Sequence, residues 1–429
     1  MKRSFLKFAV IALCAGLTFT ACKKDKGGDD NGEIKNSEKT VEQNKADLQQ
    51  AGINLSNELK AMQDSKAMDA LLQLANLQKN KELKAYALKS TDIDAKLKGF
   101  SESEELDTLA KTIDEMSGVW EWNATDKDFV KKSESKDAVT YKFPYDANSS
   151  SNNCEVNAKV EYASNVKNMP GKVNCSLKID GKELLNISYV GSFTNEGYPT
   201  SIVETMKIDD FSLSTEYTRS NSKLSVSISF LHGKTTLLNC TNSIEGSLTD
   251  ENIDKLFADS DEEGEDDSED YDFMASVISK ATISTQVMNF KFVGSVATKS
   301  LAELAKKVDN KAEVASKEEV ENLVKSANDA IDCYVVNVSD NTKIASVKLF
   351  VVKDEDAETA ESYDAEPMLV FPDETKMTFE DYFKTGFEEV GNAFEDLYKS
   401  FEESLDKYGL TDGDDGKVYD NDEDYTYGD

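Results

Sequence analysis

The chain has 429 residues and a formal net charge of −34, and it contains a single histidine, His232. The length allows one large domain or two of medium size. The excess of carboxylates argues strongly against a body that binds nucleic acid or an anionic membrane, because both need basic patches. A single histidine argues against a His-based triad or a zinc site built from several histidines.

The first 21 residues are predicted to be a secretory signal peptide. A basic start is followed by an apolar stretch over residues 5–19, which is shorter than the roughly 20 apolar residues that a spanning helix needs. The stretch ends in Phe19-Thr20-Ala21-Cys22, which resembles the lipobox of bacterial lipoproteins. The resemblance implies that Cys22 is diacylated and becomes the mature N-terminus. Plain secretion, with cleavage after Ala21, is the alternative.

The lipobox resemblance also implies a location. Phe19 departs from the pattern, which usually has an aliphatic residue at this position. Lys23 follows the cysteine, whereas an Asp there usually retains Gram-negative lipoproteins in the inner membrane, so the resemblance implies an outer-membrane protein on either the periplasmic or the cell-surface face. Residues 22–37 are predicted to be a flexible tether, because residues 23–33 contain no apolar side chain.

Residues 38–117 are predicted to form a helical segment. One apolar stripe at helical spacing runs over residues 41–62 and a second over 71–77, and Asp64-Ser65 separates them. The capping box Ser101-x-x-Glu104 predicts the start of a third helix. We expect these helices to cover a core.

Residues 118–297 are predicted to form a long, curled antiparallel β-meander of eight to ten strands. In the stretch Leu224–Phe230, apolar residues alternate with serine, which is typical of a strand with one buried and one wet face. Turn signals separate the alternating runs, namely Pro170-Gly171, Asp180-Gly181, Ser220-Asn221 and His232-Gly233. An acidic loop at 259–272 interrupts the meander, and a sheet of this length must curl.

The cysteines on the predicted strands allow a disulfide. Cys154, Cys175 and Cys240 each fall on the apolar side of an alternating run. An oxidising envelope compartment permits a bridge, and Cys154 with Cys175, across the hairpin that turns at Pro170, is the pair we expect. The alternative is that these cysteines are free and pack as small apolar side chains.

The acidic loop contains a calcium candidate. Five acids fall at positions 1, 3, 5, 9 and 12 of an EF-hand-like loop, namely Asp259, Asp261, Glu263, Asp267 and Asp270. An Asp replaces the usual bidentate Glu at the last position, and a predicted strand follows where a helix should. We therefore expect a solvated loop and no cofactor, with calcium as the alternative.

Residues 298–410 are predicted to form an α+β segment. It contains two helices, a hairpin that turns at Asp340-Asn341, a short strand at 368–371 and a helix over 378–408. Phenylalanines recur every three or four residues along this last helix, so we expect it to dock within the chain as a lid or wall of the core, with a partner interface as the alternative. Residues 411–429 are predicted to be an acidic, disordered tail.

The sequence thus predicts an α+β protein with N-terminal helices, a long curled antiparallel β-meander and a C-terminal amphipathic helix. No motif of a nucleophile, phosphate or metal enzyme occurs in it, so no catalytic residue is assigned. The function expected is that of a non-catalytic, lipid-anchored cell-envelope protein with a binding or structural role toward an envelope protein. One alternative is a carrier that binds an apolar ligand on a sheet resembling a half-barrel, and a second is a carboxylate-based hydrolase.

Overall fold

The computed structural model describes most of the chain between residues 34 and 408. The described ranges are 34–78, 110–111, 113–136, 138–145, 151–256, 273–298, 317–353 and 363–408. The predicted signal peptide, Cys22, the acidic loop with its calcium candidate, and the acidic tail lie outside these residues. The described elements confirm the α+β class.

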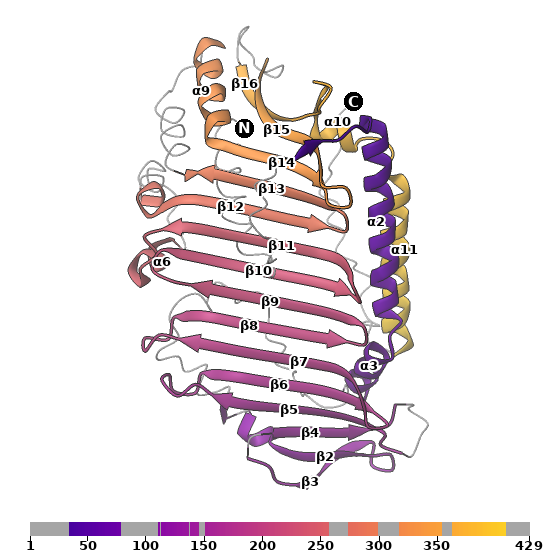
Figure 1. Ribbon diagram of the computed structural model, residues 1–429. Helices are drawn as coiled ribbons and strands as arrows, with labels where there is room; N and C mark the ends of the chain where they lie inside the picture. Colours follow the sequence, from indigo (N-terminus) through magenta and orange to yellow (C-terminus); the bar gives the residue numbers. More distant parts are fainter. Residues whose placement is uncertain are drawn as a thin grey trace.

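The strands of the described residues form one sheet of 17 members (Figure 1). From β4 to β17 each strand pairs antiparallel with the next one along the chain. At one end β2 lies between β3 and β4 and is parallel to β4, and the short β1 pairs parallel with the start of β15. The strand bounds are β1 (Lys35–Asn36), β2 (Gly118–Asn123), β3 (Asp128–Ser133), β4 (Ala138–Phe143), β5 (Cys154–Tyr162), β6 (Pro170–Ile179), β7 (Lys182–Phe193), β8 (Pro199–Ile208), β9 (Phe211–Arg219), β10 (Lys223–His232), β11 (Thr235–Gly246), β12 (Ile278–Val287), β13 (Phe290–Ala297), β14 (Ile331–Asn337), β15 (Thr342–Lys353), β16 (Tyr363–Val370) and β17 (Lys376–Thr378).

The sheet is larger than the sequence predicts. Twelve strands, β2 to β13, lie where eight to ten are expected. The sheet continues beyond residue 297. β13 pairs antiparallel with β14, with Val296 opposite Ile331 and Phe290 opposite Asn337. The predicted hairpin at Asp340-Asn341 is confirmed as the β14–β15 turn, but it extends the same sheet.

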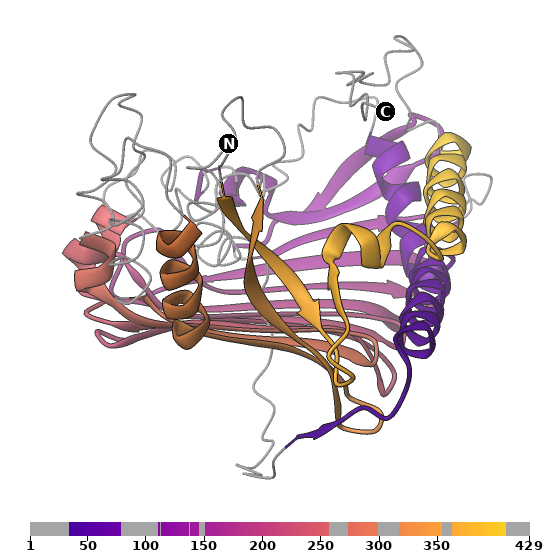
Figure 2. The same cartoon turned by 90° about the horizontal axis from the view of Figure 1, so that it is seen from above.

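Alternation along the strands gives the sheet one apolar and one polar face. Direct partners across strands share a face, so Leu224 of β10 lies in one row with Ile244, Ala281 and Val296. On the opposite face, seven neighbouring strands each place a hydroxyl residue in one row, namely Ser192, Ser201, Thr218, Ser225, Ser243, Thr282 and Ser295. Figure 2 shows the sheet bent into a trough, as expected for so many twisted strands.

Helices cover the two ends of the strands on the apolar, concave side (Figure 2). The helix bounds are α2 (Val41–Gln63), α3 (Lys66–Gln78), α6 (Asp250–Leu256), α9 (Lys317–Ala330), α10 (Phe379–Phe383) and α11 (Glu388–Lys407). Thr40 and Gln43 form a capping box at the start of α2. The predicted break at Asp64-Ser65 is confirmed as the joint between α2 and α3.

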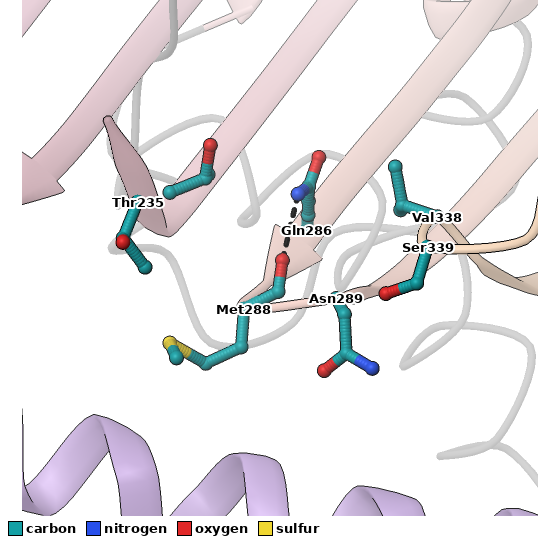
Figure 3. A pocket seen from close by; sticks show the side chains of 7 residues that line it. Thr235, Gln286, Met288, Asn289, Val338 and Ser339 are labelled. Carbon is teal, nitrogen blue, oxygen red and sulfur yellow. Dashed lines mark hydrogen bonds between the residues drawn. The ribbon is translucent and has the colours of Figure 1, made fainter.

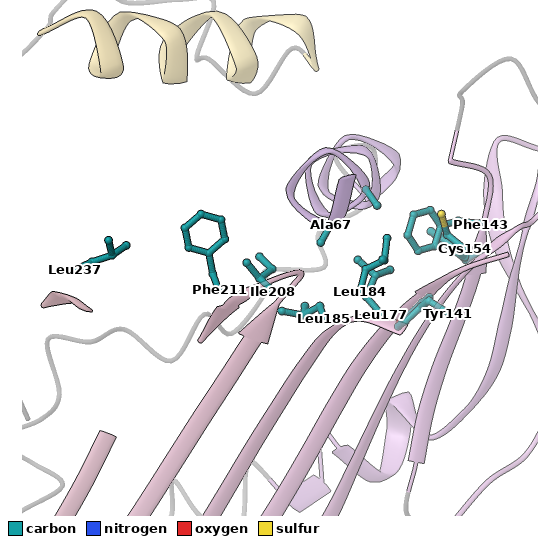
Figure 4. Close-up of a cluster of buried hydrophobic side chains, with 12 residues drawn as sticks. Ala67, Tyr141, Phe143, Cys154, Leu177, Leu184, Leu185, Ile208, Phe211 and Leu237 are labelled. Carbon is teal, nitrogen blue, oxygen red and sulfur yellow. The ribbon is translucent and has the colours of Figure 1, made fainter. Parts of the chain in front are cut away.

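The largest core lies between α3 and the strand ends. Figure 4 shows Ala67 of α3 above Leu177 and Leu184, and Phe211 further along the same face. A second core lies under α6, around Leu224 and Ile253. Smaller cores lie beneath α9 and beneath α10 with the first half of α2.

The predicted disulfide is wrong. Cys154 and Cys175 are both free thiols. Cys154 pairs across the β5–β6 ladder with Ile179, and Cys175 pairs with Ala158. The two cysteines are therefore displaced by four residues along neighbouring strands, which corresponds to about 13 Å, and a disulfide needs Cα atoms within about 7 Å.

Candidate interaction surface

The C-terminal helices carry the main exposed apolar surface of the described residues. Eight large apolar side chains in these ranges are exposed, and five of them lie on α10 and α11. We call these five the aromatic face, and they are Phe379, Phe383, Phe394, Tyr398 and Phe401. Tyr398, with 62% of its surface exposed, is the most open of them.

The single helix predicted over 378–408 is in fact two helices. Gly386 has a φ of +81°, a left-handed conformation that favours glycine, and it lies between α10 and α11. None of residues 388–407 is buried. The helix does not form the predicted lid on the sheet, because it packs on α2 and so forms an outer layer (Figure 1).

Several hydrogen bonds link α11 to α2. Gln49 donates to Glu389 over 3.3 Å, Ser56 Oγ donates to the Ala393 carbonyl over 2.7 Å, and Gln63 donates to both Ser400 and Ser404. Residues later in α2 thus contact residues later in α11, so the two helices run parallel. Because Ala393, Ser400 and Ser404 lie on the side of α11 that faces α2, the phenylalanine stripe is left half-exposed.

The helices approach closely at Gly52 of α2. A Cβ atom at this position would lie 2.8 Å from Val390 Cγ1, which is closer than van der Waals contact allows. Gly52 therefore sets the short distance between the helices at this level, in the way that small residues allow backbones to approach.

The first end of the aromatic face is held by Lys45 and Tyr382. Lys45 Nζ donates to Thr385 Oγ1 over 3.2 Å and lies 5.6 Å from the ring centroid of Phe387. Tyr382 is buried, and its ring contacts Phe383 at a centroid distance of 5.1 Å. These contacts fix α10 to α2 and to the core below it.

The other end of α11 is held by Asp69 of α3. Its carboxylate accepts hydrogen bonds from Tyr145 (2.8 Å), Lys407 (2.9 Å) and Tyr408. Burial raises the pKa of Asp69, but the hydrogen bonds from Tyr408, Lys407 and Tyr145 outweigh it and hold this pKa below its ordinary value. Burial and the bond to Asp69 raise the pKa of Tyr145 to about 12.

Carboxylates border the aromatic face. Glu388, Glu395 and Glu402 repeat every seven residues along α11, and Glu389, Asp396 and Glu403 follow them one position later. Lys399 is paired with Glu395 at 2.5 Å, so it leaves most of this charge uncompensated. The Tyr398 hydroxyl bonds Glu402, which raises the pKa of Tyr398. The surface is therefore an aromatic stripe with an acidic border.

A second surface is the middle of the concave face. Ile228, Phe292, Val173 and Tyr189 lie on this face between the helix-covered ends, and all four are half-buried. Glu204 is exposed among them, and burial, with a smaller contribution from its charge, raises the pKa of Tyr189 to about 12.

Two cavities lie at strand ends and not in this middle strip. The first, of about 250 Å³, is lined by residues of the β12–β13 turn and by Thr235, Val338 and Ser339 (Figure 3). Gln286 in its wall donates to the Met288 carbonyl over 2.7 Å. The second, of about 270 Å³, has Lys280, Asp329 and Asp332 in its lining.

The single histidine, His232, links the sheet to α2. His232 closes β10 at the predicted turn, its ring stacks on Phe211 at a centroid distance of 4.0 Å, and its Nδ1 lies 2.5 Å from a carboxylate oxygen of Glu58. These contacts join α2 to the sheet. In the part of the chain that the structure describes, no group of three or more His, Cys, Asp and Glu side chains is arranged to hold a metal ion.

Comparison with known proteins adds no relative. No family model, curated protein or solved structure matches this chain. Within the described ranges, no helix has both the length and the apolar character needed to cross a bilayer.

Proposed function

We propose that this protein is a non-catalytic binding protein of the cell envelope, anchored in the outer membrane through Cys22, that holds a partner protein on the aromatic face. The observation that carries the proposal is the gathering of five exposed aromatic side chains within residues 379–401. Exposed apolar patches of this kind mark interaction sites, and aromatic residues dominate the binding energy of protein interfaces.

The packing of α11 supports the proposal. A helix that served only to cover the core would turn its aromatic stripe toward α2. Instead Ser400, Ser404 and Ala393 face α2, and Phe394 and Phe401 keep about two fifths of their surface in water. Leaving this apolar area exposed costs free energy in the isolated protein, and a bound partner would recover it.

The charges around the aromatic face define the partner. The acidic border disfavours an anionic membrane surface, and it disfavours a second copy of this chain because a twofold contact would bring like charges together. The border fits a partner segment with apolar side chains at helical spacing and lysine or arginine beside them, laid along α11.

Site-specific photo-cross-linking in intact cells tests this function. We expect p-benzoylphenylalanine at position 401 or 398 to give one protein adduct. The same group at Val190, which is about as exposed as Phe401 but lies on the polar face of β7, should give none. Glu395→Gln with Glu402→Gln should weaken the adduct at 401, because the partner is basic. An adduct to lipid, an adduct of twice the chain mass, or equal labelling from position 190 would contradict the proposal.

A second candidate function is a carrier of an apolar ligand. The half-buried apolar strip in the middle of the concave face favours it. Native mass spectrometry of the purified protein tests it, since a carrier should retain a co-purified lipid and a protein with a filled core should not.

A further inference from the structure

Arg219 is an unusual residue in this protein. The sequence has two arginines, and the other, Arg3, lies in the predicted signal peptide. Arg219 ends β9 and lies directly opposite Leu224, so it belongs to the apolar, concave face. Its side chain is only 4% exposed. A guanidinium keeps its charge at any ordinary pH, so this position buries a permanent cation.

Part of the guanidinium is paired. Asp250, at the start of α6, forms an ion pair with Nη2 of Arg219. The ring of Tyr198 lies 5.5 Å from Cζ, a cation–π contact, and a further hydrogen bond joins Arg219 to Tyr217. Asp250 is 38% exposed, so the pair lies where solvent reaches one side of it.

A second guanidinium nitrogen of Arg219, Nη1, has no hydrogen-bond partner among the described residues. Nη1 of Arg219 is buried, and no hydrogen-bond acceptor among the described residues lies within reach of it. Leaving a buried, charged donor without an acceptor costs free energy. The planar fork of a guanidinium matches a carboxylate in particular, and the protein already places one carboxylate on it.

The surroundings define the rest of the ligand. Leu224 and Tyr217 are buried beside Arg219, and Ile202 and Val226 continue the same face toward the half-buried middle strip. A hydrophilic anion would gain nothing from these side chains, whereas an apolar chain would bury surface against them.

We propose that Arg219 binds the carboxylate of a ligand with an apolar chain, of the fatty-acid class, with the chain lying along the concave face. Asp250 competes with the ligand for the guanidinium, so it limits the affinity. The inference deepens the carrier candidate and is independent of a partner on the aromatic face.

Titration of the full mature chain, carrying Cys22→Ala and free of detergent, tests the site. Dodecanoate is the probe, and dodecanol is the uncharged match. We expect dodecanoate to bind about tenfold more tightly than dodecanol. Asp250→Asn should raise the dodecanoate affinity several-fold and leave dodecanol unchanged, because it removes the competing carboxylate. Arg219→Lys keeps the charge but not the fork, so it should lower the dodecanoate affinity about tenfold.

Glu251→Gln is the matched control for Asp250→Asn. It removes a neighbouring acid of α6 that pairs only with Lys255 at the surface, so it should leave both affinities unchanged. Equal affinities for the two ligands, no binding of either, or an Asp250→Asn variant that binds like the parent while melting normally would overturn the proposal. Any of these results would leave the cross-linking test of the aromatic face unaffected.

Discussion

Asp69 joins three parts of the chain that are far apart in sequence. One carboxylate accepts hydrogen bonds from Tyr145 beyond β4 and from Lys407 and Tyr408 at the end of α11. The folded-state pKa of Asp69 is below its ordinary value, whereas the unfolded chain has the ordinary value of about 3.9. The ionised carboxylate therefore stabilises the fold above that pH, and the contribution is lost as the pH falls through the folded-state pKa.

We predict that Asp69→Asn lowers the free energy of unfolding by about 1–2 kcal/mol at pH 7, because hydrogen bonds to a charged group are lost at a partly exposed site. Urea denaturation at pH 7 and at pH 3 checks this, and the difference from the parent should shrink at the lower pH. Asp332→Asn, at an exposed position of β14, should match the parent at both pH values. A difference that grows on acidification would contradict the sign.

The buried thiol of Cys154 should be unreactive in the folded protein. Cys154 is fully buried, and burial, with a smaller contribution from Asp180, raises its pKa to about 11. Because the thiolate is the reactive species, iodoacetamide at pH 8 should leave Cys154 unmodified in the native protein and alkylate it in guanidinium. Peptide mass mapping distinguishes these results, and a disulfide-linked peptide containing Cys154 would refute the free thiol.

At the scale of elements, the parallel pair of α2 and α11 decides where the aromatic face points. The hydrogen bonds at Ser56 and Gln63 fix the rotation of α11 about its axis, and the close approach at Gly52 fixes its distance from α2. A change at Gly52 should therefore act on α11 without touching the aromatic face itself.

We predict that Gly52→Ala loosens α11, although alanine is the better helix former by about 1 kcal/mol, because the new Cβ would lie 2.8 Å from Val390 Cγ1. Amide hydrogen exchange over residues 388–407 should become faster, and Val390→Ala in the same chain should restore it.

Gly391 provides the control for this prediction. A Cβ at Gly391 has no neighbour within 4 Å, so Gly391→Ala should slow exchange in α11 by stabilising the helix by about 0.5–1 kcal/mol. If Gly52→Ala left the exchange of α11 unchanged, the close approach would not control the position of this helix.

At the scale of the whole molecule, one continuous sheet carries every surface described above. The helices lie over the two ends of its concave side, and α11 adds an outer layer on α2 (Figure 2). A single sheet of this size can hold the aromatic face and the Arg219 site in fixed positions.

The proposed anchor at Cys22 should decide whether the protein is bound to a membrane. Two acyl chains hold a protein stably on a membrane, whereas one chain does not, so Cys22→Ala should move the protein from the membrane pellet to the soluble fraction. Cys14→Ala should leave it in the pellet, because Cys14 lies outside the stretch Phe19–Cys22 that resembles a lipobox. A Cys22→Ala variant that still pellets in high salt would place the anchor elsewhere.

Local patterns in the sequence determine much of this fold. The joint at Asp64-Ser65 and the alternating strands are predicted because each depends on neighbouring residues alone. The turn at Asp180-Gly181 is predicted for the same reason, and both residues adopt the left-handed conformation that such turns need.

Only the tertiary structure decides register, the extent of the sheet and the outward turn of α11. Alternation tells which face a side chain occupies but not which residue lies opposite, so the four-residue displacement of Cys154 from Cys175 is invisible in the sequence. Likewise, the aromatic stripe of α11 shows that apolar surface favours burial, but it does not show which surface buries it. The burial of Arg219 is likewise decided by the tertiary structure, because its partner Asp250 lies on α6, which the fold brings to the end of β9.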